Sequence, residues 1–191
     1  MLVTNMSRMD RAARTHSALL RAALELFDER GYDATTAAAI AARAGVTEMT
    51  FFRHFPSKDA VLVDDPYDPL IAEAVARQPA ALSPMAAVIA GVREAWQAVP
   101  APAAVEVRDR LRVVSRTPSL RGALARNSAR SADAITAALQ SRGVPTHEAR
   151  IAAAAMMGAL NAALLEWADG EGSELGSAID DALRVLEGGR A

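Results

Sequence analysis

The side chains best suited to chemistry lie close together in residues 36–55, TAAAIAARAGVTEMTFFRHF. Hydroxyl, carboxylate, thioether and guanidinium groups follow one another there, at Thr47, Glu48, Met49, Thr50 and Arg53. Groups of this kind form hydrogen bonds and apolar contacts with the phosphates and base edges of DNA. We therefore start from the hypothesis that this stretch contacts a nucleic acid.

A glycine and a small apolar plug indicate how the stretch folds. Gly45 can take the positive φ that a tight turn between two helices needs, and Ala41 is small enough to lie where the second helix crosses the first. The residues spaced to fill the space beneath the crossing are Ile40, Val46 and Phe51. This arrangement is a helix-turn-helix, whose second helix fits the DNA major groove. The glycine and plug alone also fit an ordinary corner between two helices.

Capping residues set the expected limits of the short helices. Thr35 or Thr36 can accept hydrogen bonds from the free amides of a helix that runs to about residue 44. Thr47 can cap the next helix, which ends before Pro56, and Ser57 can cap a fourth. Five side chains of the third helix are then expected to point outward: Glu48, Met49, Thr50, Phe52 and Arg53.

A first helix is predicted from apolar residues at helical spacing, and Gly31 stops it. These apolar residues are Leu19 or Leu20, Ala23, Leu24 and Phe27. Arginines occur four times in the first 21 residues, with Asp10 as the only acid. Two of them, Arg11 and Arg14, lie just before this helix or at its start. They either reach a phosphate or the minor groove, or are solvated in a disordered arm.

Residues 19–62 resemble the N-terminal domain of the TetR family, the tetracycline-repressor-like regulators. The resemblance rests on LF, GY, TT, IA, AGVT and HFPSKD in that order and spacing. It implies a homodimer in which each protomer offers one helix-turn-helix to half of a near-palindromic double-stranded DNA operator. It also implies a repressor that a small-molecule effector releases, although the sequence does not exclude activation.

The resemblance assigns roles to individual positions. Bases and nearby phosphates would face Thr47, Glu48, Met49 and Thr50. The DNA backbone would be contacted by Thr36, Phe52, His54 and Lys58, which is the only lysine in the chain. Two positions depart from the usual pattern: Met49 stands where glycine is common, and Phe52 where tyrosine is common. Phe52 either packs on sugar or a thymine methyl, or turns inward, and Glu48 either accepts from cytosine or complements the helix dipole.

Composition restricts the other possibilities. The 191 residues carry a formal net charge of −2, which argues against a nonspecific polycation, and no cysteine, which excludes a disulfide or thiolate site. The sequence predicts no metal site and no cofactor. The N-terminus lacks the apolar core of a signal peptide, and the apolar run 151–165 is short for a membrane span. We expect a cytoplasmic protein without a membrane partner.

The rest of the chain predicts an all-α second domain. The segment DDPYDP breaks the pattern, so we place a helix-turn-helix domain at 1–63 and a helical ligand-binding and dimerisation domain at 64–191. Its helices are expected at 68–78, 84–98, 102–116, 119–142, 146–168 and 175–187, with breaks at Pro79, Pro100, Pro118, Gly143 and Gly170.

The last two helices are the predicted dimer surface, because the first of them is apolar nearly all round and the second has apolar residues at helical spacing. The candidate interface residues are Ala155, Leu160, Leu164, Ile179, Leu183 and Leu186. The alternative is a hairpin within one chain. The candidate effector contacts are Trp96, Arg108, Arg112, Met156 and Asn161. The alternatives to effector contact are that Met156 packs in the core and that the arginines lie on a solvated helix face.

The sequence allows two other functions. A helix-turn-helix protein controlled by a protein partner would have its apolar pocket closed by its own side chains. A helical enzyme is the remote alternative, because HEAR at His147 lacks the second histidine of a zinc-protease motif and no serine lies in a nucleophile elbow. We therefore predict a protein that is not an enzyme.

Overall fold

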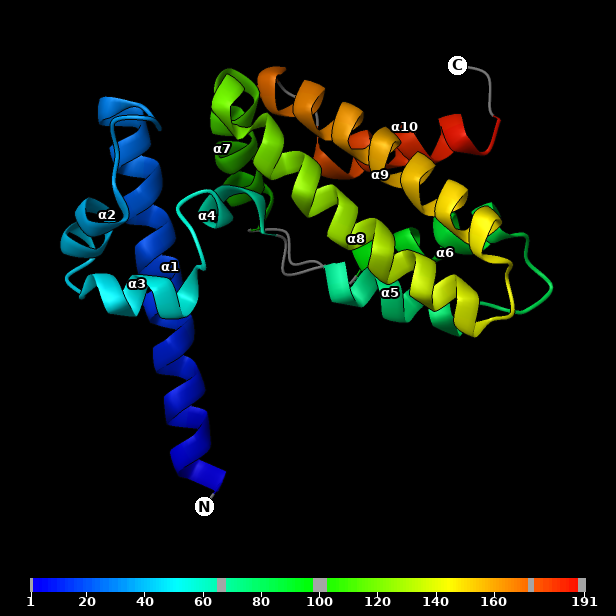
Figure 1. Ribbon diagram of the computed structural model, residues 1–191, viewed down its shortest axis with the longest axis horizontal. Helices are drawn as coiled ribbons and strands as arrows, with labels where there is room; N and C mark the ends of the chain where they lie inside the picture. Colours follow the sequence, from blue (N-terminus) through cyan, green and yellow to red (C-terminus); the bar gives the residue numbers. More distant parts are fainter. Residues whose placement is uncertain (1, 65–67, 98–102, 172–173, 189–191) are drawn as a thin grey trace.

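A computed structural model describes residues 2–64, 68–97, 103–171 and 174–188. The predicted all-α fold is confirmed, since every regular element in these ranges is a helix (Figure 1). The N-terminal helices are α1 (Leu2–Arg30), α2 (Ala37–Arg43), α3 (Glu48–His54) and α4 (Ala60–Val63). The later ones are α5 (Asp68–Arg77), α6 (Pro84–Gln97), α7 (Ala103–Arg116), the 3₁₀ turn η1 (Pro118–Leu120), α8 (Arg121–Ser141), α9 (Thr146–Asp169) and α10 (Leu175–Leu186).

The first helix is much longer than the apolar pattern predicted. It begins at Leu2 and runs for 29 residues, so Arg11 and Arg14 lie inside α1 and do not belong to a disordered arm. The sequence from residue 2 to residue 30 contains no glycine or proline, and nothing therefore interrupts the helix. Gly31 ends it with φ of 79°, as expected.

Two apolar cores organise the chain. The first joins α1, α2, α3 and α4, and it also takes in Val114 from α7, Leu120 from η1 and Ala123 from α8. The second lies among α5, α6, α8, α9 and α10. The division at residues 63/64 stays a prediction, and residues 65–67 of the proline-rich break lie outside the described residues. Helices α7 and α8 are therefore in direct contact with the N-terminal unit through Val114 and Ala123.

The later helices agree with the predicted ranges to within about two residues at each end. Gly143, with φ of 84°, separates α8 from α9, and the predicted break at Pro100 lies outside the described residues. Helices α5 and α6 approach closely at Gly91, where a Cβ atom would lie 2.5 Å from Val75 Cγ2 and 2.8 Å from its backbone nitrogen. A side chain at residue 91 would therefore push these two helices apart.

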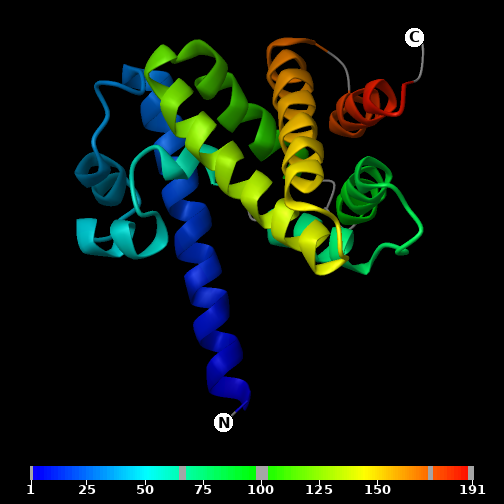
Figure 2. The ribbon, with the colours of Figure 1, turned by 45° about the vertical axis from the view of Figure 1, so that its right-hand side comes forward.

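Helix α9 is long and apolar, with 24 residues and a mean hydropathy of 1.4 over its most apolar window. By length and composition alone it would be able to cross a membrane. In this fold it packs against α6, α7, α8 and α10 (Figure 2). Its apolar character is therefore largely that of a core helix, but one face, which includes Ile151, remains exposed.

Candidate nucleic-acid interface

The turn between α2 and α3 has the geometry that the sequence predicted. Thr36 caps α2, because its hydroxyl oxygen accepts a hydrogen bond from Ala39 N at 3.1 Å. Gly45 follows with φ of 71°, and Val46 N donates to Ala41 O at 2.9 Å. A residue with a Cβ atom would be strained at such a φ, so glycine fixes the angle at which α3 leaves α2.

The predicted apolar plug lies beneath this crossing. Ile40 and Phe51 are fully buried, Ala41 is 1% exposed, and Val46 is partly buried against the same core. Arg43 fixes the opposite side of α2 to α1 through ion pairs with Glu29 at 2.8 Å and Glu25 at 3.3 Å. The sequence analysis missed this contact, which lowers the pKa of Glu29 mainly through its hydrogen bonds with Arg43. Helix α2, on which α3 packs, is thus fixed by the apolar plug on one side and by the Arg43 ion pairs on the other.

Thr47 caps α3 as predicted. Its Oγ1 accepts a hydrogen bond from Thr50 N at 3.2 Å, and the two threonine hydroxyls lie 3.0 Å apart. The Thr50 hydroxyl therefore already has a partner within the helix. These bonds fix the first turn of α3 before any ligand arrives, which reduces the entropy lost on binding.

The outward surface of α3 is mainly apolar, with charges beside it. Met49 is 81% exposed and Phe52 is 49% exposed, although large apolar side chains are normally buried. The exposed fraction of Phe52 favours the outward orientation of this side chain over the inward one. Its ring also contacts the Phe51 ring edge-on, with the two ring centroids 5.3 Å apart. Glu48 and Arg53 are exposed on the same helix. This surface suits a groove that contains both methyl groups and hydrogen-bonding edges.

A pair of histidines joins the end of α3 to α1. The His16 ring packs on Phe55 with centroids 4.4 Å apart and lies 6.1 Å from the ring of His54. Burial first, and then the neighbouring His54, lowers the pKa of His16. Burial and Arg53 lower the pKa of His54 in the same way. His16 was not among the predicted residues, because its role depends on a contact between helices that spacing does not reveal.

Lys58 does not reach outward as the resemblance implied. Its ammonium donates to Tyr32 O at 2.7 Å and to Thr35 O at 2.8 Å, and it lies 3.9 Å from the centroid of the Tyr32 ring. Burial lowers the pKa of Lys58, and burial followed by Asp59 and Asp33 raises the pKa of Tyr32 to about 12. Lys58 thus connects the start of α4 to the loop between α1 and α2, and its predicted phosphate contact stays a prediction.

Three arginines of the C-terminal helices hold α4. Arg110 of α7 donates to the carbonyl oxygens of Leu62, at 3.1 Å, and of Asp64. From α8, Arg130 bonds the Asp64 carboxylate at 2.7 Å, and Arg126 bonds that of Asp59 at 3.0 Å. Arg110 thus occupies the carbonyl end of α4, where a cation is favoured by the helix dipole. These bonds join α7 and α8 to the end of the helix-turn-helix unit.

The five predicted effector residues do not converge on one cavity. Met156 is fully buried in the core, and Trp96 packs against the backbone at Gly176. The remaining three have partners within the protomer. Arg108 stacks over the Trp167 ring at 4.3 Å, Arg112 Nε donates to Ala168 O at 2.8 Å, and Asn161 Nδ2 donates to Ser128 Oγ at 2.7 Å.

Asn161 does line an internal cavity of about 100 Å³ between α4, α5, α7, α8 and α9. Most of its lining is aliphatic, and the polar groups are Arg110, Asn127 and Asn161. Sequence analysis missed Arg110 and Asn127, which were hidden among solvated arginines and small polar residues of the two helices. The cavity lining thus includes one cation and two amides.

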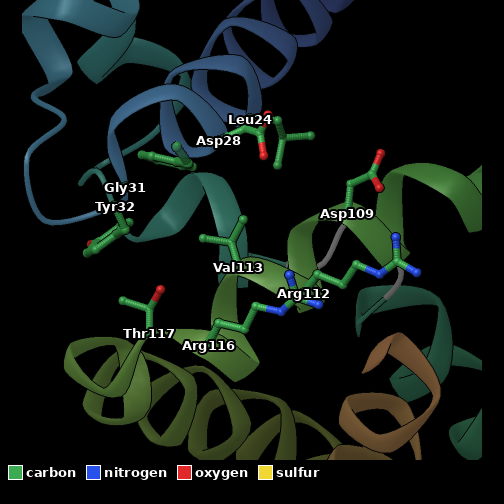
Figure 3. Close-up of a pocket in the computed structure, with 10 residues that line it drawn as sticks. Leu24, Asp28, Gly31, Tyr32, Asp109, Arg112, Val113, Arg116 and Thr117 are labelled. Carbon is green, nitrogen blue, oxygen red and sulfur yellow. The ribbon is translucent and has the colours of Figure 1, made fainter. Parts of the chain in front are cut away.

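A larger groove, open to the surface, lies between α1 and α7 and has a volume of about 560 Å³. Figure 3 shows Leu24, Asp28 and Tyr32 on one side of it and Asp109, Arg112 and Arg116 on the other. Arg116 lies 3.8 Å from Asp169 and is largely exposed. The groove is a surface depression where the N-terminal unit meets α7.

The predicted dimer residues divide into two groups. Leu160, Ile179 and Leu183 are 7%, 7% and 0% exposed, so their side chains pack inside the protomer and leave no surface for a partner. That part of the prediction is corrected: because α9 is apolar nearly all round, its periodicity did not distinguish the inner face from the outer one. The other three, which are Ala155, Leu164 and Leu186, are partly exposed.

Comparison with known proteins decides the family. The profile described as "Bacterial regulatory proteins, tetR family" matches residues 19–64, and the profile described as "MftR C-terminal domain" matches residues 82–191, more than half of the chain. The chain belongs to the TetR family. It is thereby a DNA-binding transcriptional regulator of a family that is not enzymatic, as the sequence predicted.

Individual TetR-family relatives agree with this assignment. The HTH-type transcriptional regulator TcmR of Streptomyces glaucescens is 48% identical over 54 residues, 28% of this chain and 24% of that protein. YdeS of Bacillus subtilis (strain 168) is 44% identical over 50 residues, 26% of this chain and 25% of that protein. The matches thus span about a quarter of each curated relative. Among solved structures, native NalD of Pseudomonas aeruginosa has a TM-score of 0.53 and 25% identity, and the match covers 93% of this chain and 97% of NalD.

Proposed function

We propose that the protein is a homodimer that represses transcription by binding a near-palindromic operator, with one α3 in the major groove of each half-site. The observation that carries this proposal is the capped α3 with Met49 and Phe52 exposed on a buried apolar plug. The repressor direction follows NalD, which is described as the secondary repressor of a multidrug efflux pump. Because operators lie on chromosomal DNA, we place the protein in the bacterial cytoplasm.

The chemistry of α3 favours contacts with thymine. Exposed thioether and phenyl groups pack against the C5-methyl group that thymine presents in the major groove. Arg53 would pair with a phosphate or guanine, and the Thr36 hydroxyl, which accepts from Ala39 N, still has its own hydrogen to donate to a phosphate. Thr47 and Thr50 mainly stiffen the first turn, through the bonds between them.

Selection of binding sequences from a random duplex library tests the proposal. The full chain is expected to enrich two inverted half-sites rich in A·T pairs, with centres one helical turn, about 34–36 Å, apart or a multiple of this. Met49→Ala should relax the preference at one or two pairs by about 1–3 kcal/mol each. Ala125→Ser, an exposed change on α8, is the matched control. Enrichment of no sequence by the wild-type chain would contradict the proposal.

We place the dimer surface on the outer face of α9. Ile151 is 67% exposed, and Ala154, Gly158 and Ala162 follow it at helical spacing and are exposed too. A Cβ atom added at Gly158 would meet nothing within 4 Å. Glycine inside a helix costs about 0.5–1 kcal/mol relative to alanine, and packing within the protomer gives no reason for it. Close approach of a second α9 supplies one.

Gly158→Leu tests this surface. The added side chain would separate the two α9 helices, so sedimentation at micromolar concentration should shift from dimer to monomer while the protomer stays helical. Gly122→Leu is the control, because this glycine of α8 is exposed and its added Cβ would meet only the flexible end of Arg126 at 3.4 Å. A Gly158→Leu variant that remains a dimer would exclude this face.

The internal cavity is our candidate for the effector site. Its aliphatic wall suits an apolar body, and Arg110, Asn127 and Asn161 suit a carboxylate or carbonyl at one end. An oxygen that binds Arg110 would compete with the carbonyl oxygens of Leu62 and Asp64 for the same guanidinium. Release of these carbonyls would loosen α4 and change the spacing of the two α3 helices.

The volume of about 100 Å³ also favours the second candidate, control by a protein partner. Ligand pockets commonly measure about 300–1,000 Å³, so an effector must displace side chains such as Met157. Thermal shift with straight-chain carboxylic acids of increasing length separates the two. Stabilisation that depends on chain length and disappears in Arg110→Met supports the effector. No stabilisation by any of them, with DNA binding intact, favours the protein partner.

A further inference from the structure

Helix α1 continues well beyond the helix-turn-helix unit. His16 packs on Phe55, the residue after α3, so residues 2–15 lie further along α1 than the end of α3. At 1.5 Å per residue, fourteen residues of helix extend about 21 Å. Figures 1 and 2 both show this part of α1 projecting away from the other helices.

The projecting part of α1 lies on the same side of the N-terminal unit as the exposed face of α3. In both views α2 and α3 lie beside the middle of α1, and α1 continues past α3 in the direction away from α2. The side of α3 that faces α2 is closed by the plug around Phe51, whereas Met49 and Phe52 are exposed. A duplex bound to the exposed face of α3 would therefore lie next to the projecting helix.

The charge of this segment matches a polyanion. Residues 8–21 contain four arginines and one acid, and the side chains of Arg11, Arg14 and Arg21 are all exposed. Among the side chains that the structure describes, which in α1 begin at residue 11, no acidic one forms an ion pair with Arg11 or Arg14. An isolated helix of this length is marginally stable in water, so contacts from outside the protomer are expected to hold it.

We propose that the projecting part of α1 is a second DNA-binding element, in which Arg11 and Arg14 bind phosphates outside the base pairs that α3 covers. This inference rests on the proposed operator binding by α3. The projecting segment adds affinity without base preference, because guanidinium–phosphate contacts carry no direct sequence information. It also lengthens the duplex that the protein needs for full affinity.

The test uses the full chain and the duplex recovered by selection. For Arg11→Ala/Arg14→Ala, the slope of log K against log salt should fall by about 3.6 units for the dimer, since four phosphate contacts are lost and each contributes about 0.9. The base preference should stay that of the wild type. Removing flanking base pairs from the duplex should then weaken the wild type and leave the double variant almost unchanged.

Two controls separate charge from folding. Arg11→Lys/Arg14→Lys keeps the charge and should keep the slope. Arg121→Ala removes one exposed charge at the start of α8, near the other end of α1, where Ser119 bonds Asp33, and should change nothing. Circular dichroism of the alanine double variant should match that of the wild type.

The outcomes distinguish this inference from the proposed function. Unchanged salt slope and unchanged duplex-length dependence in the alanine double variant, with base preference intact, would overturn the role of α1 alone. A change in oligomeric state with unchanged DNA affinity would overturn it as well, because α1 would then contact a partner protomer. Failure of the wild-type chain to bind any duplex would overturn the operator proposal together with this one.

Discussion

Replacing Lys58 by methionine should destabilise the protein and leave its salt-dependent DNA affinity nearly unchanged. The ammonium donates to Tyr32 O at 2.7 Å and Thr35 O at 2.8 Å, and it stacks 3.9 Å from the Tyr32 ring centroid. Hydrogen bonds to a charged group contribute about 1.5–3 kcal/mol each, and a cation–π contact about 1 kcal/mol. Desolvation of the ammonium, evident in its lowered pKa, offsets part of this.

The net loss should be about 2–4 kcal/mol of unfolding free energy. Tyr32 O keeps the hydrogen bond that it accepts from Thr35 N at 3.1 Å, so the bonds are not simply additive. Methionine retains the apolar stem over the ring, and the variant therefore isolates the ammonium. Urea unfolding followed by circular dichroism gives the free energy, and titration of the selected duplex over a range of salt gives the slope.

Arg53→Met is the matched comparison, because Arg53 is an exposed cation on α3. Its salt slope should fall by about two units, because the dimer loses one cation from each α3, with a stability change under about 0.5 kcal/mol. If Lys58→Met behaved like this instead, with unaltered stability and a slope lowered by about two units, Lys58 would be a phosphate contact and its structural role would be refuted.

Three further changes test the packing and the histidine pair. Gly91→Ala should destabilise the C-terminal core by about 1–3 kcal/mol in urea unfolding, because its Cβ meets backbone atoms of Val75; a neutral result would show that α5 and α6 separate easily. Phe51→Ala should cost about 3–5 kcal/mol and abolish operator binding, whereas retained binding would mean that the plug does not orient α3. His16 and His54 have lowered pKa values in the fold, so the unfolded chain takes up protons first as pH falls below about 6.5, and stability should drop from pH 7.5 to 5.5. The charged groups around this pair are Arg53, Asp64, Glu106 and Arg110. The melting temperature of His16→Phe should depend less on pH than that of the wild type, and an equal drop in both would exclude His16 as the cause.

Local signals predicted the helix-turn-helix almost completely. Thr36, Gly45 and Thr47 act through atoms within a few residues of themselves, so the sequence alone contains the information. The predicted start of α1 was wrong because the prediction used only the periodicity of apolar residues. The projecting segment has few core contacts to create such a pattern, but the absence of glycine and proline from residue 2 onward was a usable signal.

Contacts between distant segments set the limit of sequence analysis. Lys58 was expected to bind phosphate, and only the fold brings the carbonyl oxygens of Tyr32 and Thr35 within its reach. Helix α9 gave no clear inner face, because apolar residues surround it on nearly all sides. Exposure of Ile151 in the folded protomer was needed to locate the outer face.

Hydroxyl-radical footprinting of the wild-type chain on its selected duplex tests the central claim most directly. We predict two protected half-sites related by inversion, with centres about 34–36 Å apart or a multiple of this, and protection that Phe51→Ala abolishes. Contact by α3 further predicts that Met49→Ala alters the preferred bases inside those half-sites. Uniform protection without half-sites, or base preferences that remain identical after Met49→Ala, would contradict the assignment of α3 as the helix that reads the DNA.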